Sequence, residues 1–127
     1  MRLKITLPAA SLALAFSIVA VNVAAKSASV TVNGYVLDSA CAFTKDLAKP
    51  ISRKCALSCA NAGSPLVILA DDGTIYWPIA GTTPASGQNS KLLAYAGRKV
   101  TISGDVFERG GSRAIVISHI EEQAAHK

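Results

Sequence analysis

The stretch GRKVTISGDVFERGGSRAIVISHIEE, residues 97–122, decides the fold class of this chain. Apolar and polar residues alternate in its first half, which is typical of a β-strand with one buried face. Gly110-Gly111 then stands where a tight turn belongs, and a second apolar segment rich in β-branched residues follows. Gly104 interrupts the alternation, and a residue without a side chain allows a strand to bend sharply. The stretch therefore predicts a long β-hairpin with a bend in its first strand.

Three further strands are predicted nearer the N-terminus. Residues 28–38, ASVTVNGYVLD, alternate in the same way around a glycine, Gly34. Residues 66–79 predict a second hairpin, in which the apolar run LVILA is followed by a turn at Asp71-Asp72-Gly73 and by a strand rich in β-branched and aromatic residues. Pro78 has no N–H to donate, so it is expected at the edge of a sheet.

Two helices separate these strands. Residues 53–62, RKCALSCANA, follow a capping residue, Ser52, and stop before Gly63, which predicts a helix of about three turns. Residues 89–97, NSKLLAYAG, predict a shorter helix. The order is strand, helix, strand, strand, short helix, strand, strand. It predicts a mainly β fold, a small five-stranded barrel of OB type. In this fold the cysteine-bearing helix is inserted between strands 1 and 2, and the short helix lies between strands 3 and 4.

This order, with VNGYVLD early and AGRKVTISGDVFERGGSRAIVISHI late, resembles the exported bacterial OB-fold (BOF-like) domains. Their Gly-x-x-Val-x-Val-x-Gly strand start is matched by Gly97, Val100, Ile102 and Gly104. The chain also resembles a little-characterised secreted family with the pattern Asp-x-x-Cys, Cys-Ala-x-x-Cys and Gly-x-Pro-Leu-Val. The matching residues are Asp38, Cys41, Cys55, Ala56, Cys59, Gly63, Pro65, Leu66 and Val67. The resemblance implies a small periplasmic or secreted domain, and it carries over no catalytic residue.

The N-terminus has the layout of a secretory signal peptide. Arg2 and Lys4 precede an uncharged apolar run that ends in small residues at Val23-Ala24-Ala25. We predict cleavage after Ala25, which gives a signal peptide at 1–25 and a single mature domain at 26–127 with no membrane span. The 13 basic residues of the chain include the two that are removed, so 11 face 8 acidic residues in the mature chain, a net charge of +3. The predicted location is periplasmic or secreted, where disulfides persist.

The cysteines Cys41, Cys55 and Cys59 carry the most informative chemistry. Cys55 and Cys59 are four residues apart, so they share one face of the predicted helix with Cβ atoms about 5 to 6 Å apart. A disulfide needs about 3.5 to 4.5 Å between Cβ atoms, so a bridge inside the helix would distort it. The expected bridge therefore joins Cys41 to Cys55 or to Cys59. It closes a loop of about 15 residues and stabilises the domain by about 3 kcal/mol.

Two alternatives use the same thiols differently. Cys41, Cys55 and Cys59 together are a candidate thiolate site for Cu(I) or Zn(II), because soft metals prefer sulfur ligands. His119 is the candidate fourth ligand of that site. The second alternative is a thiol redox protein, in which Lys54 lowers the pKa of the neighbouring thiol. Thioredoxin-type chemistry, however, uses two intervening residues between its cysteines where this helix has three.

The remaining observations exclude other functions. The basic residues form no run or stripe, and we interpret the strand aromatics, Trp77 among them, as core residues, so a nucleic-acid partner is not expected. The chain has no Ser-His-Asp set and no phosphate-binding glycine loop, so it is not expected to be an enzyme. The sequence predicts an exported non-enzymatic binding domain of the cell envelope, with a helix held by a Cys41 disulfide. A small ligand, a metal ion or an envelope protein is the expected partner.

Overall fold

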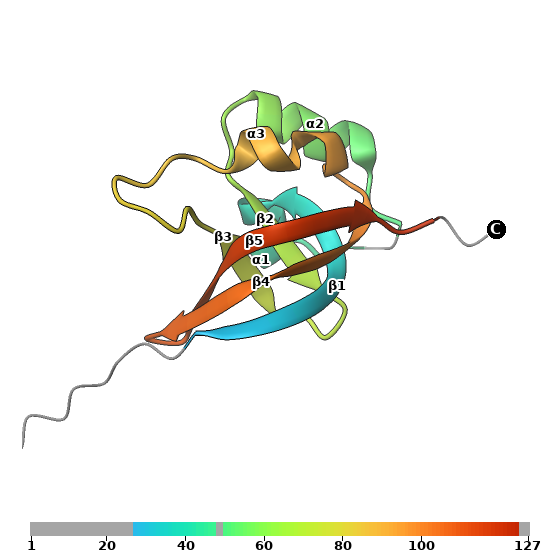
Figure 1. Ribbon diagram of the computed structural model, residues 1–127. Helices are drawn as coiled ribbons and strands as arrows, with labels where there is room; N and C mark the ends of the chain where they lie inside the picture. Colours follow the sequence, from blue (N-terminus) through green and yellow to red (C-terminus); the bar gives the residue numbers. More distant parts are fainter. Residues whose placement is uncertain (1–26, 48–49, 125–127) are drawn as a thin grey trace, which may run out of the picture.

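Five β-strands close into a barrel in the order β1-β2-β3-β5-β4 (Figure 1). The computed structural model describes residues 27–47 and 50–124, and the predicted signal peptide lies outside them. The strands are β1 (Ala28–Asp38), β2 (Leu66–Ala70), β3 (Ile75–Pro78), β4 (Lys99–Arg109) and β5 (Ser112–Glu122). The predicted mainly β barrel and both predicted hairpins are confirmed.

Four short helical segments connect the strands. They are α1 (Ser39–Thr44), α2 (Arg53–Asn61), α3 (Asn89–Leu92) and the 3₁₀ turn η1 (Leu93–Tyr95). Helix α2 begins as predicted, with the Ser52 side chain accepting a hydrogen bond from the N–H of Cys55 at 3.3 Å. Helix α1 was not predicted, because its six residues are too few to show a periodic apolar pattern. None of the helices among the described residues is long and apolar enough to cross a membrane.

Strand β1 changes partner at Gly34. Its first part pairs with β4 as far as Tyr35, and its last part, from Gly34 onward, pairs with β2. A Cβ atom on Gly34 would lie only 2.4 Å from the carbonyl oxygen of Leu69. A second close approach occurs in the β4–β5 hairpin, where a Cβ on Gly104 would lie 2.2 Å from the carbonyl oxygen of Val116. The two predicted glycine bends are therefore places where the backbones of adjacent strands meet too closely for any side chain.

The barrel closes through a parallel pairing of β3 with β5. The predicted edge at Pro78 is found on the β2 side alone, where the pairs with β3 end at Tyr76, because on the other side Pro78 lies opposite Ile115 of β5. The ladder continues past the proline through the N–H of Ile79, which donates to the carbonyl of Ile115 at 2.9 Å. Successive N–H groups of a strand point in opposite directions. The missing N–H of Pro78 is therefore on the side away from β5, and the closure loses no bond there.

The core fills the barrel and the space beneath α2 and α3, which lie together at one end of it (Figure 1). Its buried members are Val32, Val36, Ala56, Ala60, Leu66, Ile68, Ala70, Leu92, Ala96, Val100, Ile102 and Ile115. Helix α2 is attached to η1 by Arg53, whose Nη1 donates to the carbonyls of Ala94 and Ala96 at 3.2 and 2.9 Å. Gly97 allows this close packing, since a Cβ there would lie 2.5 Å from the Cα of Arg53.

We expect Gly34→Ala and Gly104→Ala each to lower the free energy of unfolding by about 2 kcal/mol or more, because the new methyl group meets a backbone carbonyl that cannot move aside. Urea denaturation of the two variants measures this. Gly87→Ala is the matched control, since Gly87 lies in a loop with no atom within 4 Å of the added Cβ. Its stability should stay within about 0.5 kcal/mol of the parent chain. Equal stabilities for all three variants would contradict this account of the bends.

Candidate thiolate metal site

Helices α1 and α2 bring all three cysteines together. Cys41 comes from α1, and Cys55 and Cys59 come from successive turns of α2. Each of the three Sγ atoms lies within 4.8 Å of the other two. Cys41 and Cys59 are half-buried and Cys55 is exposed. Within the part of the chain that the structure describes, this is the one group of at least three His, Cys, Asp or Glu side chains with ligand atoms this close.

Asp38 positions the first of these thiols. It is the last residue of β1 and the N-cap of α1, and its Oδ1 accepts a hydrogen bond from the N–H of Cys41 at 2.8 Å. Asp is among the preferred N-cap residues because its side chain satisfies a donor that the first helical turn leaves free. The Asp-x-x-Cys spacing in the sequence is thus the spacing from an N-cap to the third helical residue.

The same carboxylate connects α1 to the end of α2. Its Oδ2 accepts a hydrogen bond from the hydroxyl of Ser64, just beyond the C-terminus of α2. Ser64 is held in turn by Asn89, which donates to its carbonyl at 2.7 Å and accepts from the N–H of Leu66 at 2.9 Å. Asp38 is only 3% exposed, and Ser64 and Asn89 are half-buried, so a polar chain runs from the end of β1 past the end of α2 to α3. Neither Asp38 nor Ser64 was among the predicted site residues.

The electrostatics of the site keep two of the thiols protonated in the metal-free protein. Burial, followed by the hydrogen bond to Asp38 and the negative charge of that carboxylate, raises the pKa of the Cys41 thiol to about 11. Burial also raises the pKa of Cys59, with smaller effects from Cys55 and Asp38. Burial raises the pKa of Asp38 as well, but hydrogen bonds from Ser64 and Cys41 outweigh it and leave that pKa lowered. Cys41 and Cys59 therefore lack the depressed pKa of reactive thiols.

A cavity of about 60 Å³ adjoins the cluster. Cys41 and Cys55 line it together with the apolar side chains of Leu37, Leu47 and Ile51. An apolar wall next to ligand sulfurs limits the access of water and lowers the local dielectric constant, which strengthens the attraction between a cation and thiolates. One side of the cluster is thus shielded, while Cys55 keeps the other side accessible.

The predicted Cys41 bridge is not formed in the structure, and His119 lies apart from the three cysteines. The structure contains neither the Cys41–Cys55 nor the Cys41–Cys59 disulfide, since all three cysteines are free. The sulfurs form a triangle, an arrangement that suits one shared ligand, whereas a bridge would draw one pair to about 2.05 Å. His119 is not part of the cluster. It lies on β5, 66% exposed, with its Nε2 at 3.7 Å from a carboxylate oxygen of Glu121.

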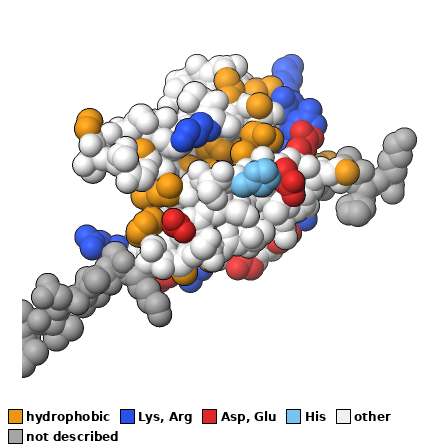
Figure 2. Space-filling model, viewed as in Figure 1, with side chains coloured by type: hydrophobic (Ala, Val, Ile, Leu, Met, Phe, Trp, Pro, Cys, Tyr) orange, Lys and Arg blue, Asp and Glu red, His pale blue; other side chains and the backbone are white. Residues whose placement is uncertain are grey.

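The visible face of the molecule carries small, separate groups of acidic and basic side chains (Figure 2).

Comparison with known proteins adds no further evidence about the site, because no family model, curated protein or solved structure matches the chain. The resemblance to exported bacterial OB-fold domains therefore stays a prediction.

Alkylation of the metal-free, reduced chain tests the electrostatics of Cys41. Only the thiolate reacts, and with a pKa of about 11 it is about one part in a thousand of the Cys41 population at pH 8. We expect Cys41 to be the slower of Cys41 and Cys55 to react with iodoacetamide, with a rate that rises about tenfold per pH unit from pH 8 to 10. Peptide mass mapping over time measures both sites. Equal rates at Cys41 and the exposed Cys55 at pH 8 would contradict the assignment.

Asp38→Asn tests the buried carboxylate. We expect this variant to unfold about 1 to 3 kcal/mol more easily at pH 7, because a buried charge-assisted hydrogen bond from Ser64 is lost. The pKa of Asp38 is lowered on folding, so its contribution is complete above the unfolded pKa near 4 and is lost as pH falls through the folded value. The stability difference from the parent chain should therefore shrink below about pH 4. Urea denaturation between pH 3 and 7 measures it, with the exposed Asp105→Asn as the control.

Proposed function

We propose that this chain is a non-enzymatic binding protein for a soft metal ion, held by the thiolates of Cys41, Cys55 and Cys59. The observation that carries the proposal is the mutual approach of the three Sγ atoms to within 4.8 Å. Sulfur ligands select Cu(I) and Zn(II) among the common biological metals. The chain is then an exported binding domain, as the sequence predicts, in which a metal joins the cysteines in place of the predicted disulfide.

The geometry is close to what a metal requires. A metal–sulfur distance of about 2.3 Å with tetrahedral angles places two sulfur ligands about 3.8 Å apart. The sulfurs of this site would have to approach by about 1 Å at most from their separation of up to 4.8 Å. Cys55 and Cys59 lie one helical turn apart, so rotation of their side chains supplies part of that approach while the backbone of α2 stays in place.

Cu(I) is the metal we favour. A structural Zn(II) site has four protein ligands in a tetrahedron, and among the described residues the cluster has three. Asp38 is the acidic group nearest to Cys41 along the network, and its two oxygens already accept hydrogen bonds from Cys41 and Ser64. Asp38 is therefore not a metal ligand itself. It orients the ligand Cys41 through a hydrogen bond, as carboxylates commonly do around metal sites.

The raised pKa values of Cys41 and Cys59 argue against the redox alternative. A dithiol oxidoreductase attacks its substrate with a thiolate of low pKa, and burial beside a carboxylate has the opposite effect. A metal, by contrast, displaces the thiol protons as it binds. In the periplasm or outside the cell, where we propose that the chain acts, a bound metal would also protect the three thiols from oxidation.

Metal titration of the purified chain under anaerobic conditions tests the proposal. We expect one Cu(I) per chain, detected by thiolate-to-copper charge-transfer absorption and by competition with a Cu(I) chelator. Loss of a group that only orients a ligand weakens metal binding by about 10- to 100-fold. Loss of a ligand itself should weaken Cu(I) binding by more than that in each of the variants Cys41→Ser, Cys55→Ser and Cys59→Ser. A parallel Zn(II) titration should give weaker binding than the copper titration.

Two controls make the result specific. His119→Ala should leave the affinity unchanged, because His119 lies outside the cluster. Ser58→Ala changes an exposed residue of α2 next to Cys59 and should also have no effect. Intact mass after metal removal, unfolding in urea and alkylation without reductant should then show three modified thiols, since unfolding removes the burial that slows Cys41 and Cys59. One modified thiol would indicate a disulfide in the protein as isolated and would overturn the proposal, as would serine variants that bind like the parent chain.

A further inference from the structure

A second site lies on the other side of α1. It is an open groove of about 500 Å³ between α1, the β2–β3 turn, β3 and the β4–β5 hairpin. This volume falls within the range of about 300 to 1,000 Å³ that small-molecule sites occupy. None of the three cysteines lines the groove, so a ligand bound there would not require the metal site to be occupied.

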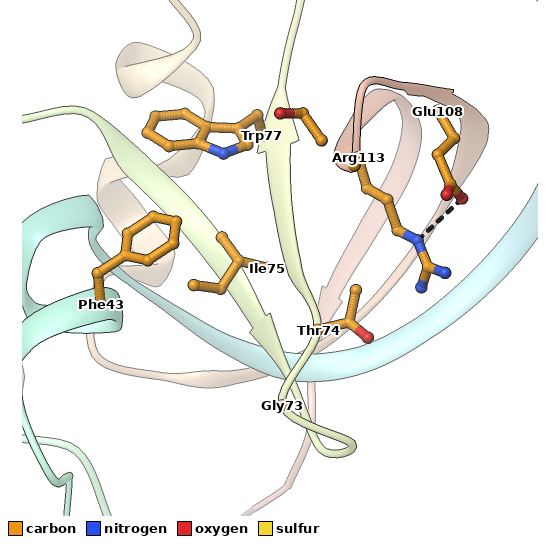
Figure 3. Close-up of a pocket in the computed structure, with 9 residues that line it drawn as sticks. Phe43, Gly73, Thr74, Ile75, Trp77, Glu108 and Arg113 are labelled. Carbon is orange, nitrogen blue, oxygen red and sulfur yellow. Dashed lines mark hydrogen bonds and ion pairs between the residues drawn. The ribbon is translucent and has the colours of Figure 1, made fainter.

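One wall of the groove is aromatic. Phe43 of α1 and Trp77 of β3 stack with their ring centroids 6.3 Å apart and their planes at 30° (Figure 3). Phe43 is 65% exposed, although an aromatic side chain normally contributes its stabilising effect by burial. The interpretation of Trp77 as a core residue is wrong in this respect, because it is half-buried and lines the groove. Ile75 extends the apolar surface between the rings and the opposite wall (Figure 3).

The opposite wall is polar and close to neutral in charge. Arg113 of β5 donates from its Nε to a carboxylate oxygen of Glu108 of β4 at 3.1 Å (Figure 3). Their side chains are 41% and 59% exposed, so both present polar atoms to the solvent in the groove. The pair offers hydrogen-bond donors and acceptors side by side. Among the described residues, Arg113 is the one cation that lines this groove, and Glu108 balances its charge.

We propose that this groove binds a neutral oligosaccharide. A sugar ring has an apolar C–H face and a rim of hydroxyl groups that both donate and accept hydrogen bonds. The aromatic wall fits the C–H face, and the Arg113–Glu108 pair fits a pair of adjacent hydroxyls. A nucleic acid fits less well, because its phosphates require several unpaired cations along the binding surface. In the part of the chain that the structure describes, the lining of this groove has a single cation, and that cation is already paired.

Trp77 is the one tryptophan of the chain, so its fluorescence reports directly on binding in this groove. We expect saturable changes in intrinsic fluorescence when the purified full-length mature chain is titrated with at least one of maltotetraose, cellotetraose and chitotetraose. The affinity should not depend on salt concentration. Phe43→Ala and Arg113→Ala should each weaken binding about tenfold. Both positions are at the surface, so the thermal unfolding temperature, measured in parallel, should stay close to that of the parent chain.

Matched controls separate the groove from the rest of the surface. Ile79→Ala removes an exposed apolar side chain outside the groove, and Lys99→Ala breaks a different exposed ion pair, with Asp71. Both should bind as the parent chain does. Absence of a saturable change with all three sugars at millimolar concentrations would overturn the proposal. Tighter, salt-sensitive binding of a thymidine hexamer would assign the groove to single-stranded nucleic acid and would also overturn it.

Discussion

The bend of β1 at Gly34 is the constraint on which the rest of the structure depends. The strand pairs with β4 before the bend and with β2 after it, so one strand serves both sides of a closed barrel. The partner backbone comes close enough at Gly34 to exclude any side chain. Because the bend redirects β1, its last residue, Asp38, arrives buried beside the helices at the end of the barrel. The bend therefore sets where α1 begins relative to the end of α2, to which Asp38 is joined through Ser64.

Asp38 then fixes the positions of α1 and α2 relative to the end of β1. It caps α1 through Cys41 and holds the end of α2 through Ser64. A buried carboxylate is costly unless hydrogen bonds satisfy it, and here they more than offset the desolvation, as its lowered pKa indicates. Burial, followed by the hydrogen bond to Asp38 and its charge, raises the pKa of Cys41. The group that positions the thiol therefore adds to the effect of burial in keeping it protonated until a competitor for the sulfur, such as a metal ion, displaces the proton.

The sequence predicted the barrel well because its signals are local. Alternation, glycine bends and turn residues identify strands, and the Ser52 cap with Gly63 delimits α2. The prediction failed where non-local geometry decides the outcome. Pro78 lies at an edge on the side of β2 alone, and nothing local in the sequence predicts its parallel pairing with β5 on the other side. The three cysteines were recognised as a set, but the choice between a bridge and a shared ligand depends on how α1 packs against α2. The pattern around α1 is too short to reveal that packing.

Helix α1 joins the two candidate sites. Cys41 and Phe43 are two residues apart on it, and side chains at that spacing point about 200° apart around a helix. One therefore faces the thiol cluster and the other faces the aromatic groove. A helix of six residues has little stability of its own, so its position is set by the Asp38 cap and by its contacts with β1 and β2. A change that loosens this cap would displace a metal ligand and an aromatic wall together, although the two sites share no side chain.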